Sequence, residues 1–170
     1  MKIEIGKIEE PIEWTVVEED EKRVIAIAEK GIIVRPFDDV MNKGIKKIFW
    51  ENSDLNQYLN NDFLKNFSDL EKQKIIEISI PSIADIERWM PKRSDKVCQP
   101  TDYAIRRGAS KYGYDGEGCV YWLSDTGRRK GLSATVILAN GVIYQSAYMY
   151  AENVCVRPMI IIRKEIRKWE

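Results

Sequence analysis

The stretch CVYWLSDTG, residues 119–127, joins an apolar run to a polar one. Its first half predicts a buried strand, because a short continuous apolar run with β-branched and aromatic members favours a strand covered on both faces. The Ser, Asp, Thr and Gly that follow are typical of a turn or loop. We therefore interpret Trp122 and Leu123 as core residues of a scaffold. The continuation SDTGRRKG, 124–131, is then where the chain leaves the scaffold for a surface.

Outward from this strand, the pattern predicts more strands on both sides. The runs 12–20 and 23–34, separated by a polar turn, predict a β-hairpin. Further strands are expected at 76–80 and in the closing run VCVRPMIII, 154–162. The segment 134–146 predicts a second hairpin, in which Asn140-Gly141 suits a type I′ turn.

The middle of the chain predicts short helices. Ser53, Ser68 and Ser82 are good N-cap residues for helices at about 54–60, 69–75 and 82–90. Strands, then helices, then strands indicate an α+β fold with a mostly antiparallel sheet. The length of 170 residues fits a single domain over 1–170, with a charged tail at 164–170.

Composition excludes several classes of protein. Lys plus Arg and Asp plus Glu both number 27, so the chain lacks the overall basic charge of a dedicated nucleic-acid binder. No apolar run is long enough to cross a membrane, and we expect no membrane insertion. The charged N-terminus, 1–14, does not resemble a signal peptide. We therefore expect a cytoplasmic protein; a phage particle or the cell surface stays open if a leader has been removed.

The absence of histidine restricts the possible chemistry. It excludes Ser-His-Asp and Cys-His catalysis and His-ligated zinc. Cys98, Cys119 and Cys155 are far apart in sequence, and we interpret them as reduced, mostly buried thiols. We expect no metal, no cofactor and no enzymatic activity.

Four stretches together resemble a known family. They are IEWTVV (12–17), WENSDLNQYLNNDFLKNFSDLEKQKI (50–75), VYWLSDTG (120–127) and GVIYQSAYMYAENVCVRPMIII (141–162). They are similar to a bacterial and phage family of domains of unknown function with W-x-x-S-x-x-R-x-W-L-N-x-x-F, W-W-L-R-S-P-G and G-V-R-P-A motifs. Asn56 and Tyr58 stand where that family has Arg and Trp. The resemblance covers about 12–163 and implies a C-type-lectin-like fold.

In C-type-lectin-like folds, the loops between the late strands form the binding face, and here they are 124–131 and 146–153. Arg and Tyr dominate interface hot spots, so these loops offer Arg128, Arg129, Tyr148 and Tyr150. We expect both tyrosines beyond the strand and Tyr144 at least partly buried. The stretch 102–116 adds candidate ligand-binding residues to the same face: Tyr103, Arg106, Arg107, Tyr112 and Tyr114.

We therefore predict a non-catalytic binding module for a protein or glycan ligand, with a homo-oligomer left open. One alternative is a nucleic-acid-associated protein that uses the Arg- and Tyr-rich loops. The other is a cysteine-dependent enzyme of the formylglycine-generating type, which requires the cysteines to converge. Arg157, before Pro158, is expected to be a fixed arginine that pairs with a carboxylate or with carbonyls.

Overall fold

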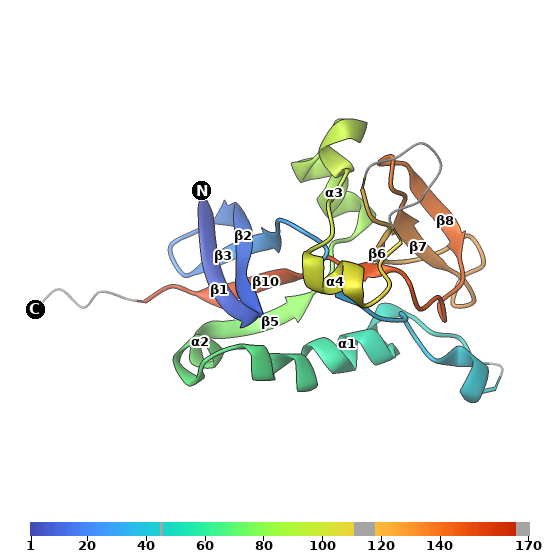
Figure 1. Cartoon of the computed structure of the whole chain (residues 1–170), viewed down its shortest axis with the longest axis horizontal. Helices are drawn as coiled ribbons and strands as arrows, with labels where there is room; N and C mark the ends of the chain where they lie inside the picture. Colours follow the sequence, from blue (N-terminus) through green and yellow to red (C-terminus); the bar gives the residue numbers. More distant parts are fainter. Residues whose placement is uncertain (45, 111–117, 166–170) are drawn as a thin grey trace, which may run out of the picture.

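A computed structural model describes residues 1–44, 46–110 and 118–165. It has an α+β fold whose strands form two five-stranded, mostly antiparallel sheets, which confirms the predicted class (Figure 1). The first sheet has the order β1-β2-β3-β10-β5. Its strands are β1 (Lys2–Ile8), β2 (Glu10–Glu19), β3 (Arg23–Ala28), β10 (Met159–Arg163) and β5 (Ile75–Ser79).

The second sheet has the order β4-β9-β6-β7-β8. Its strands are β4 (Ile33–Val34), β9 (Cys155–Val156), β6 (Tyr121–Thr126), β7 (Ala134–Ile137) and β8 (Ile143–Ala147). Only the β6–β9 pairing within it is parallel among the strands that the structure describes.

The expectation of one sheet is therefore wrong. The run 23–34 divides into β3 and β4, and the closing run divides at Arg157-Pro158 into β9 and β10. Proline lacks an N–H group and cannot donate to a ladder, so the strand ends there. The chain passes from the first sheet to the second between β3 and β4, and it returns from the second sheet to the first between β9 and β10.

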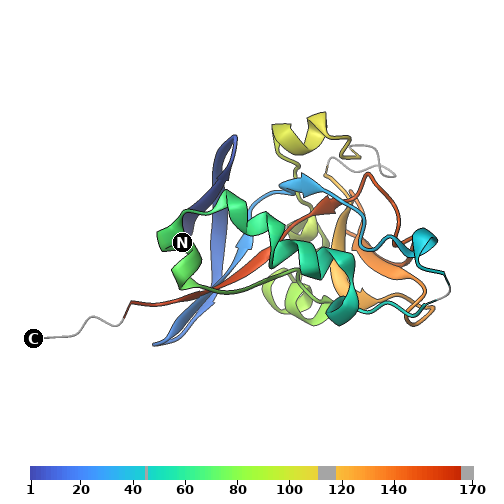
Figure 2. The ribbon, with the colours of Figure 1, turned by 90° about the horizontal axis from the view of Figure 1, so that it is seen from below.

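The predicted helices are confirmed at their N-termini. They are α1 (Asp54–Leu59), α2 (Asp69–Lys74) and α3 (Ile83–Trp89), and each begins after a serine whose hydroxyl accepts a backbone N–H. Figure 2 shows α1 and α2 crossing in front of the first sheet. The Asn60 side chain fixes α1 to β5 by bonding both the Ile78 carbonyl (2.8 Å) and the Ile78 N–H (3.1 Å).

Sequence reasoning missed several elements. It did not assign β1, and it left 91–118 without regular structure. That stretch contains α4 (Asp102–Arg106), capped by Thr101, and a 3₁₀ turn at Arg93–Lys96. Further 3₁₀ turns lie at Val40–Asn42, Trp50–Asn52 and Asp62–Asn66.

The β7–β8 hairpin turn is not of type I′. Gly141 has a φ of +87°, but Asn140 does not have the positive φ that the type requires. The Gly141 N–H instead bonds the Leu138 carbonyl at 2.8 Å, which places Gly141 after the turn. A Cβ there would lie 2.2 Å from the Arg93 carbonyl oxygen, so only glycine fits.

The core fills the space between the sheets and the helices. Trp14 and Trp122 are fully buried, and so is Leu123, as predicted. Each indole N–H finds a carbonyl: Trp14 bonds Ile5 at 2.9 Å and Trp122 bonds Arg35 at 2.8 Å. Burial of these large rings is stabilising because their polar atoms remain satisfied.

Gly6 allows β1 to approach the helical layer. It has a φ of +77° at an irregularity in the β1–β2 register, and a Cβ there would lie 2.7 Å from the Phe67 ring. The Gly6 N–H donates to the Glu71 carboxylate at 2.9 Å, which joins β1 to α2.

We expect Gly6→Ala to lower the free energy of unfolding by about 1–3 kcal/mol, because it adds backbone strain to a steric clash. Urea unfolding measures this, and an unchanged midpoint would contradict it.

A small ionic network holds residues 38–43 on the start of α1. The buried Asp38 carboxylate accepts the Asp54 N–H (2.9 Å) and the Lys43 ammonium (3.0 Å). Lys43 also donates to Asp54 at 2.6 Å, and Asp54 accepts the Asp39 N–H at 2.9 Å. Burial acts to raise the pKa of Asp54, but these two hydrogen bonds outweigh it and hold that pKa below its usual value.

We therefore expect Asp54→Asn to destabilise the fold in a pH-dependent way. A carboxylate with a lowered folded-state pKa stabilises above its unfolded pKa of about 3.9, and this contribution is lost as pH falls through the folded value. The variant should lose about 1 kcal/mol at pH 7, a modest amount because the pair is partly exposed. Urea unfolding of both proteins at pH 7 and pH 2.5 measures the difference, which should be smaller at the lower pH because more of Asp54 is then protonated. A difference independent of pH would refute the role of the charge.

Candidate functional site

The late loops leave the same end of the second sheet. Ala134, the first residue of β7, pairs with Ala147, the last residue of β8. The β6–β7 connection (127–133) and the β8–β9 connection (148–154) therefore start side by side. The Arg128 N–H donates to the Gln145 carbonyl at 2.7 Å, and the Ile48 N–H donates to the Gly131 carbonyl at 2.8 Å. A third segment, 46–50, thus joins this surface.

We call this surface the late-loop face. It comprises the exposed residues of these segments and of β8: Lys46, Lys47, Phe49, Arg128, Arg129, Lys130, Leu132, Tyr144, Ser146, Tyr148, Tyr150, Glu152 and Asn153.

The aromatic part of the late-loop face is a stacked tyrosine pair. The rings of Tyr148 and Tyr150 lie 5.3 Å apart with an interplanar angle of 22°. They are 68% and 41% exposed, while Met149 between them is buried. Both lie beyond β8, as expected. Tyr144 is 45% exposed and so partly buried, as expected; it lies on the more exposed face of β8, whose residues alternate in exposure.

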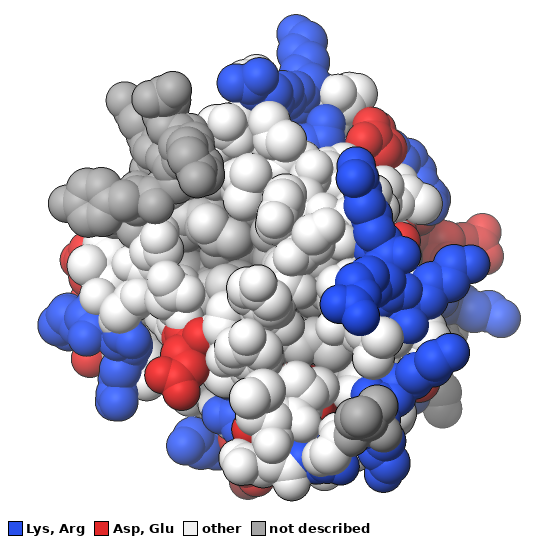
Figure 3. All heavy atoms as spheres, turned by 90° about the vertical axis from the view of Figure 1, so that its right-hand side faces the viewer, with Lys and Arg blue, Asp and Glu red and all other residues white. Residues whose placement is uncertain are grey.

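The charged part of the late-loop face is mostly basic, with Glu152 as the carboxylate among its residues. Arg128, Arg129 and Lys130 are exposed. Lys47 packs against Gly131, because a Cβ added to that glycine would lie 2.8 Å from the Cβ of Lys47. Over the described residues, none of these cations, nor Lys46, is part of an ion pair. Figure 3 looks onto this end of the molecule and shows Lys and Arg along one side of a mostly uncharged face.

Sequence reasoning missed Lys46 and Lys47. Two adjacent lysines are a weak sign of a basic surface in the sequence. The contact between Lys47 and Gly131, which is far away in the sequence, places this segment on the late-loop face.

The remaining candidate residues do not join this face. Tyr103 and Arg106 lie on α4 and Arg107 directly follows it, with its guanidinium 5.1 Å from the centre of the Tyr103 ring. Arg106 forms an ion pair with Glu9, which comes from the β1–β2 turn and has a φ of +62°. Tyr112 and Tyr114 lie outside the described residues. The predicted set therefore separates into two surfaces.

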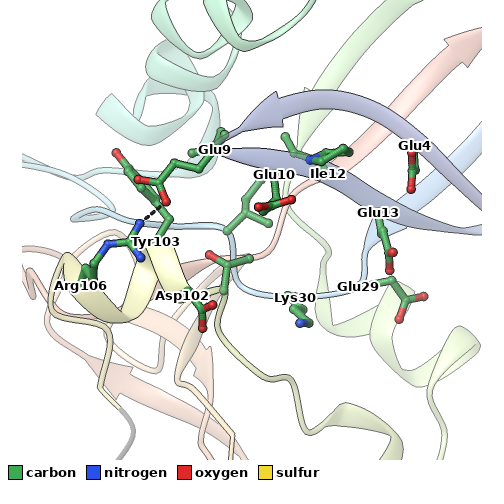
Figure 4. A pocket seen from close by; sticks show the side chains of 14 residues that line it. Glu4, Glu9, Glu10, Ile12, Glu13, Glu29, Lys30, Asp102, Tyr103 and Arg106 are labelled. Carbon is green, nitrogen blue, oxygen red and sulfur yellow. Dashed lines mark hydrogen bonds and ion pairs between the residues drawn. The ribbon is translucent and has the colours of Figure 1, made fainter.

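The second surface is a cleft of about 600 Å³ between the β1–β2 hairpin and the start of α4. Tyr103 and Arg106 line it, together with apolar residues and several carboxylates (Figure 4). We call it the acidic cleft. The Glu9 hydrogen bond raises the pKa of Arg106 above its usual value, so that guanidinium is already paired with an anion of its own chain.

The three cysteines converge, although the sequence separates them. All are free and buried in one cluster of side chains, in which the Cys98 sulfur lies 3.7 Å from the Glu29 carbonyl oxygen and 3.6 Å from that of Gln99. A Cβ on Gly31 would lie 2.9 Å from the Cys119 sulfur and 2.8 Å from the Cys155 Cβ, so that glycine makes room for the cluster. Hydrogen bonding to Cys119, followed by burial, raises the pKa of the Cys98 thiol well above its usual value.

Arg157 borders the cysteine cluster. Its Nε donates to the Ala28 carbonyl at 2.8 Å, and its terminal nitrogen donates to the Tyr121 hydroxyl at 3.3 Å. Burial acts to lower its pKa, but Cys98 and Tyr121 outweigh this and raise it. The carbonyl contact agrees with the expected role of a fixed, structural arginine.

Comparison with known protein families gives a match to part of the chain. A family model for a domain of unknown function (DUF6273) matches residues 23–97. Neither the curated proteins nor the solved structures gave a significant match. Across the described residues, no group of three or more His, Cys, Asp or Glu side chains is arranged to hold a metal ion. No helix within those residues is long and apolar enough to span a membrane.

The burial of all three thiols, together with the raised pKa values of Cys98 and Cys119, predicts unreactive cysteines. We expect the native protein at pH 7 to react with a thiol-modifying disulfide reagent only at the rate of unfolding, and all three thiols to react at once in guanidinium chloride, because thiolates are the reactive form. Absorbance of the released chromophore measures this. Rapid labelling of a single cysteine in the native protein would instead favour the cysteine-dependent enzyme.

Proposed function

We propose that the chain is a non-catalytic binding module that recognises a protein partner with an acidic surface through the late-loop face. The stacked, exposed pair Tyr148 and Tyr150 carries this proposal. Aromatic rings supply large contact area at a low cost in conformational entropy, and Tyr and Arg are enriched in interface hot spots. The unpaired cations beside the pair favour an acidic partner and would accelerate encounter with it.

A protein fits this surface better than a nucleic acid or a glycan. Bases and sugar rings bind by stacking on free aromatic faces, but here each tyrosine covers one face of the other. The nucleic-acid alternative also requires Arg106 and Arg107 on the same face. Arg106 is paired with Glu9 in an acidic cleft, which would repel phosphate.

We also propose that the fold is C-type-lectin-like and that the chain is of bacterial or phage origin. The motif resemblance supports both points. The arrangement of early and late strands in one sheet, with helices between them and a second sheet of late strands, supports the fold. In such a fold the late loops are the expected binding surface, which agrees with the position of the two tyrosines.

The proposal requires that the tyrosines contribute to binding and little to folding. We expect Tyr148→Ala/Tyr150→Ala to change the free energy of unfolding by only about 0.5 kcal/mol per exposed residue. In contrast, Trp122→Ala should cost about 3–5 kcal/mol because it empties a buried site. Thermal melting compares the three proteins. A large loss of midpoint in the double tyrosine variant would make the pair part of the scaffold and refute the binding role.

Affinity capture from a lysate of the source organism tests the partner. We expect the wild-type protein to retain a protein that the double tyrosine variant loses, since hot-spot aromatics are each worth about 2 kcal/mol or more. Leu70→Ala is the matched control, because Leu70 is 71% exposed on α2, away from this face.

The same capture separates the alternatives. The captured protein should resist nuclease and glycosidase treatment of the lysate. Binding that disappears after nuclease treatment would identify a nucleic-acid-associated protein, and binding that disappears after glycosidase treatment would identify a glycan ligand. Retention by the double tyrosine variant would exclude this surface.

A further inference from the structure

The acidic cleft brings together parts of the chain that are far apart in sequence. The β1–β2 hairpin supplies one wall, and residues 29–32 and 101–106 supply the other. Six carboxylates line it, against two cations: Glu4, Glu9, Glu10, Glu13, Glu29 and Asp102, with Lys30 and Arg106. Because Arg106 is already paired with Glu9, most of the negative charge is left uncompensated.

Three of these glutamates form a row across the sheet. Glu4 lies directly opposite Glu13 in the β1–β2 ladder, and the Glu29 N–H donates to the Glu13 carbonyl at 3.0 Å. Figure 4 shows their carboxylates at one end of the cleft. Like charges directly opposite on antiparallel strands are destabilising. Glu29 has Lys2 as a partner at 3.8 Å, but Glu4 and Glu13 form no ion pair or side-chain hydrogen bond with any described residue.

Apart from Thr101, the uncharged residues that line the cleft are apolar or aromatic. Ile8, Pro11, Ile12 and Ile32 contribute side chains to the cleft, and Tyr103 contributes a half-buried ring. Lys and Arg side chains have the complementary structure, with an apolar stem that packs on such a wall and a cationic head. A volume of about 600 Å³ exceeds one such side chain and suits a short peptide segment.

We propose that the acidic cleft is a second docking site, and that its occupant is a basic peptide segment of a partner protein. The charge complementarity of the glutamate row selects the cationic heads, and the apolar lining selects their stems. This site is independent of the late-loop face and carries the opposite charge. The repulsion between Glu4 and Glu13 is then a cost in stability that the bound cations relieve, as is common at functional sites.

Fluorescence anisotropy with a labelled peptide of five Lys-Ala repeats tests the proposal. We expect the wild-type protein to bind it, with an affinity that falls as salt is added. Glu4→Gln/Glu13→Gln should weaken binding at least tenfold and should melt at the same temperature as the wild-type protein or higher. The matched control is Glu51→Gln/Glu87→Gln, which removes the same charge from exposed positions outside the cleft and should bind normally.

Three results would overturn the proposal. The first is that the peptide does not bind the wild-type protein. The second is that both double variants bind it equally weakly, which indicates an effect of net charge alone. The third is that spermidine competes at the same concentration as the peptide, which indicates a polyamine site. The Tyr148→Ala/Tyr150→Ala variant should bind this peptide normally. Failure of the late-loop proposal and failure of this one are therefore distinguishable.

Discussion

The buried guanidinium of Arg157 holds the two sheets together. In the chain, Arg157 follows β9 of the second sheet and precedes β10 of the first. Its donors reach the Ala28 carbonyl at the end of β3, the Tyr121 hydroxyl in β6 and the Met90 sulfur beyond α3. The Tyr121 hydroxyl in turn donates to the Lys96 carbonyl at 2.7 Å. The relative placement of both surfaces depends on this junction, because the acidic cleft is built on the first sheet and the late-loop face on the second.

Local chemistry predicted three helices and most of the strand-forming runs, but not how the strands are divided between the two sheets. Ser53, Ser68 and Ser82 identified three helices, because capping depends on residues within one turn. The closing run is divided at Arg157-Pro158. From the sequence alone the run looks like one continuous strand, and only the strands that pair with each half show the division. β1 was missed because its strand is bent at Gly6, and that bend has its reason in Phe67, far along the chain.

The exposure of the candidate residues was predicted more reliably than the side chains with which they are in contact. The resemblance to C-type-lectin-like folds pointed to the late loops, and residue type within them to Tyr148, Tyr150, Arg128 and Arg129, all of which are exposed. Sequence reasoning placed Arg106 with them because a sequence gives no sign of the Glu9 contact, which spans 97 positions. The convergence of Cys98, Cys119 and Cys155 was invisible for the same reason. Long-range pairing decides which side chains meet, and local patterns do not encode it.

The central position of β10 has a consequence for how the protein is made. β3 and β5 lie within the stretch that matches the family model, yet in the sheet they are separated by β10, from the far end of the chain. During synthesis β3 lacks its second partner and β5, whose neighbour in the sheet is β10, lacks a partner strand until residues 159–163 emerge, on the order of seconds later. Nascent chains with exposed strand edges are prone to aggregation. Expression of the matched segment alone is therefore a poor substitute for the whole chain, and a chaperone that shields those edges would raise its yield.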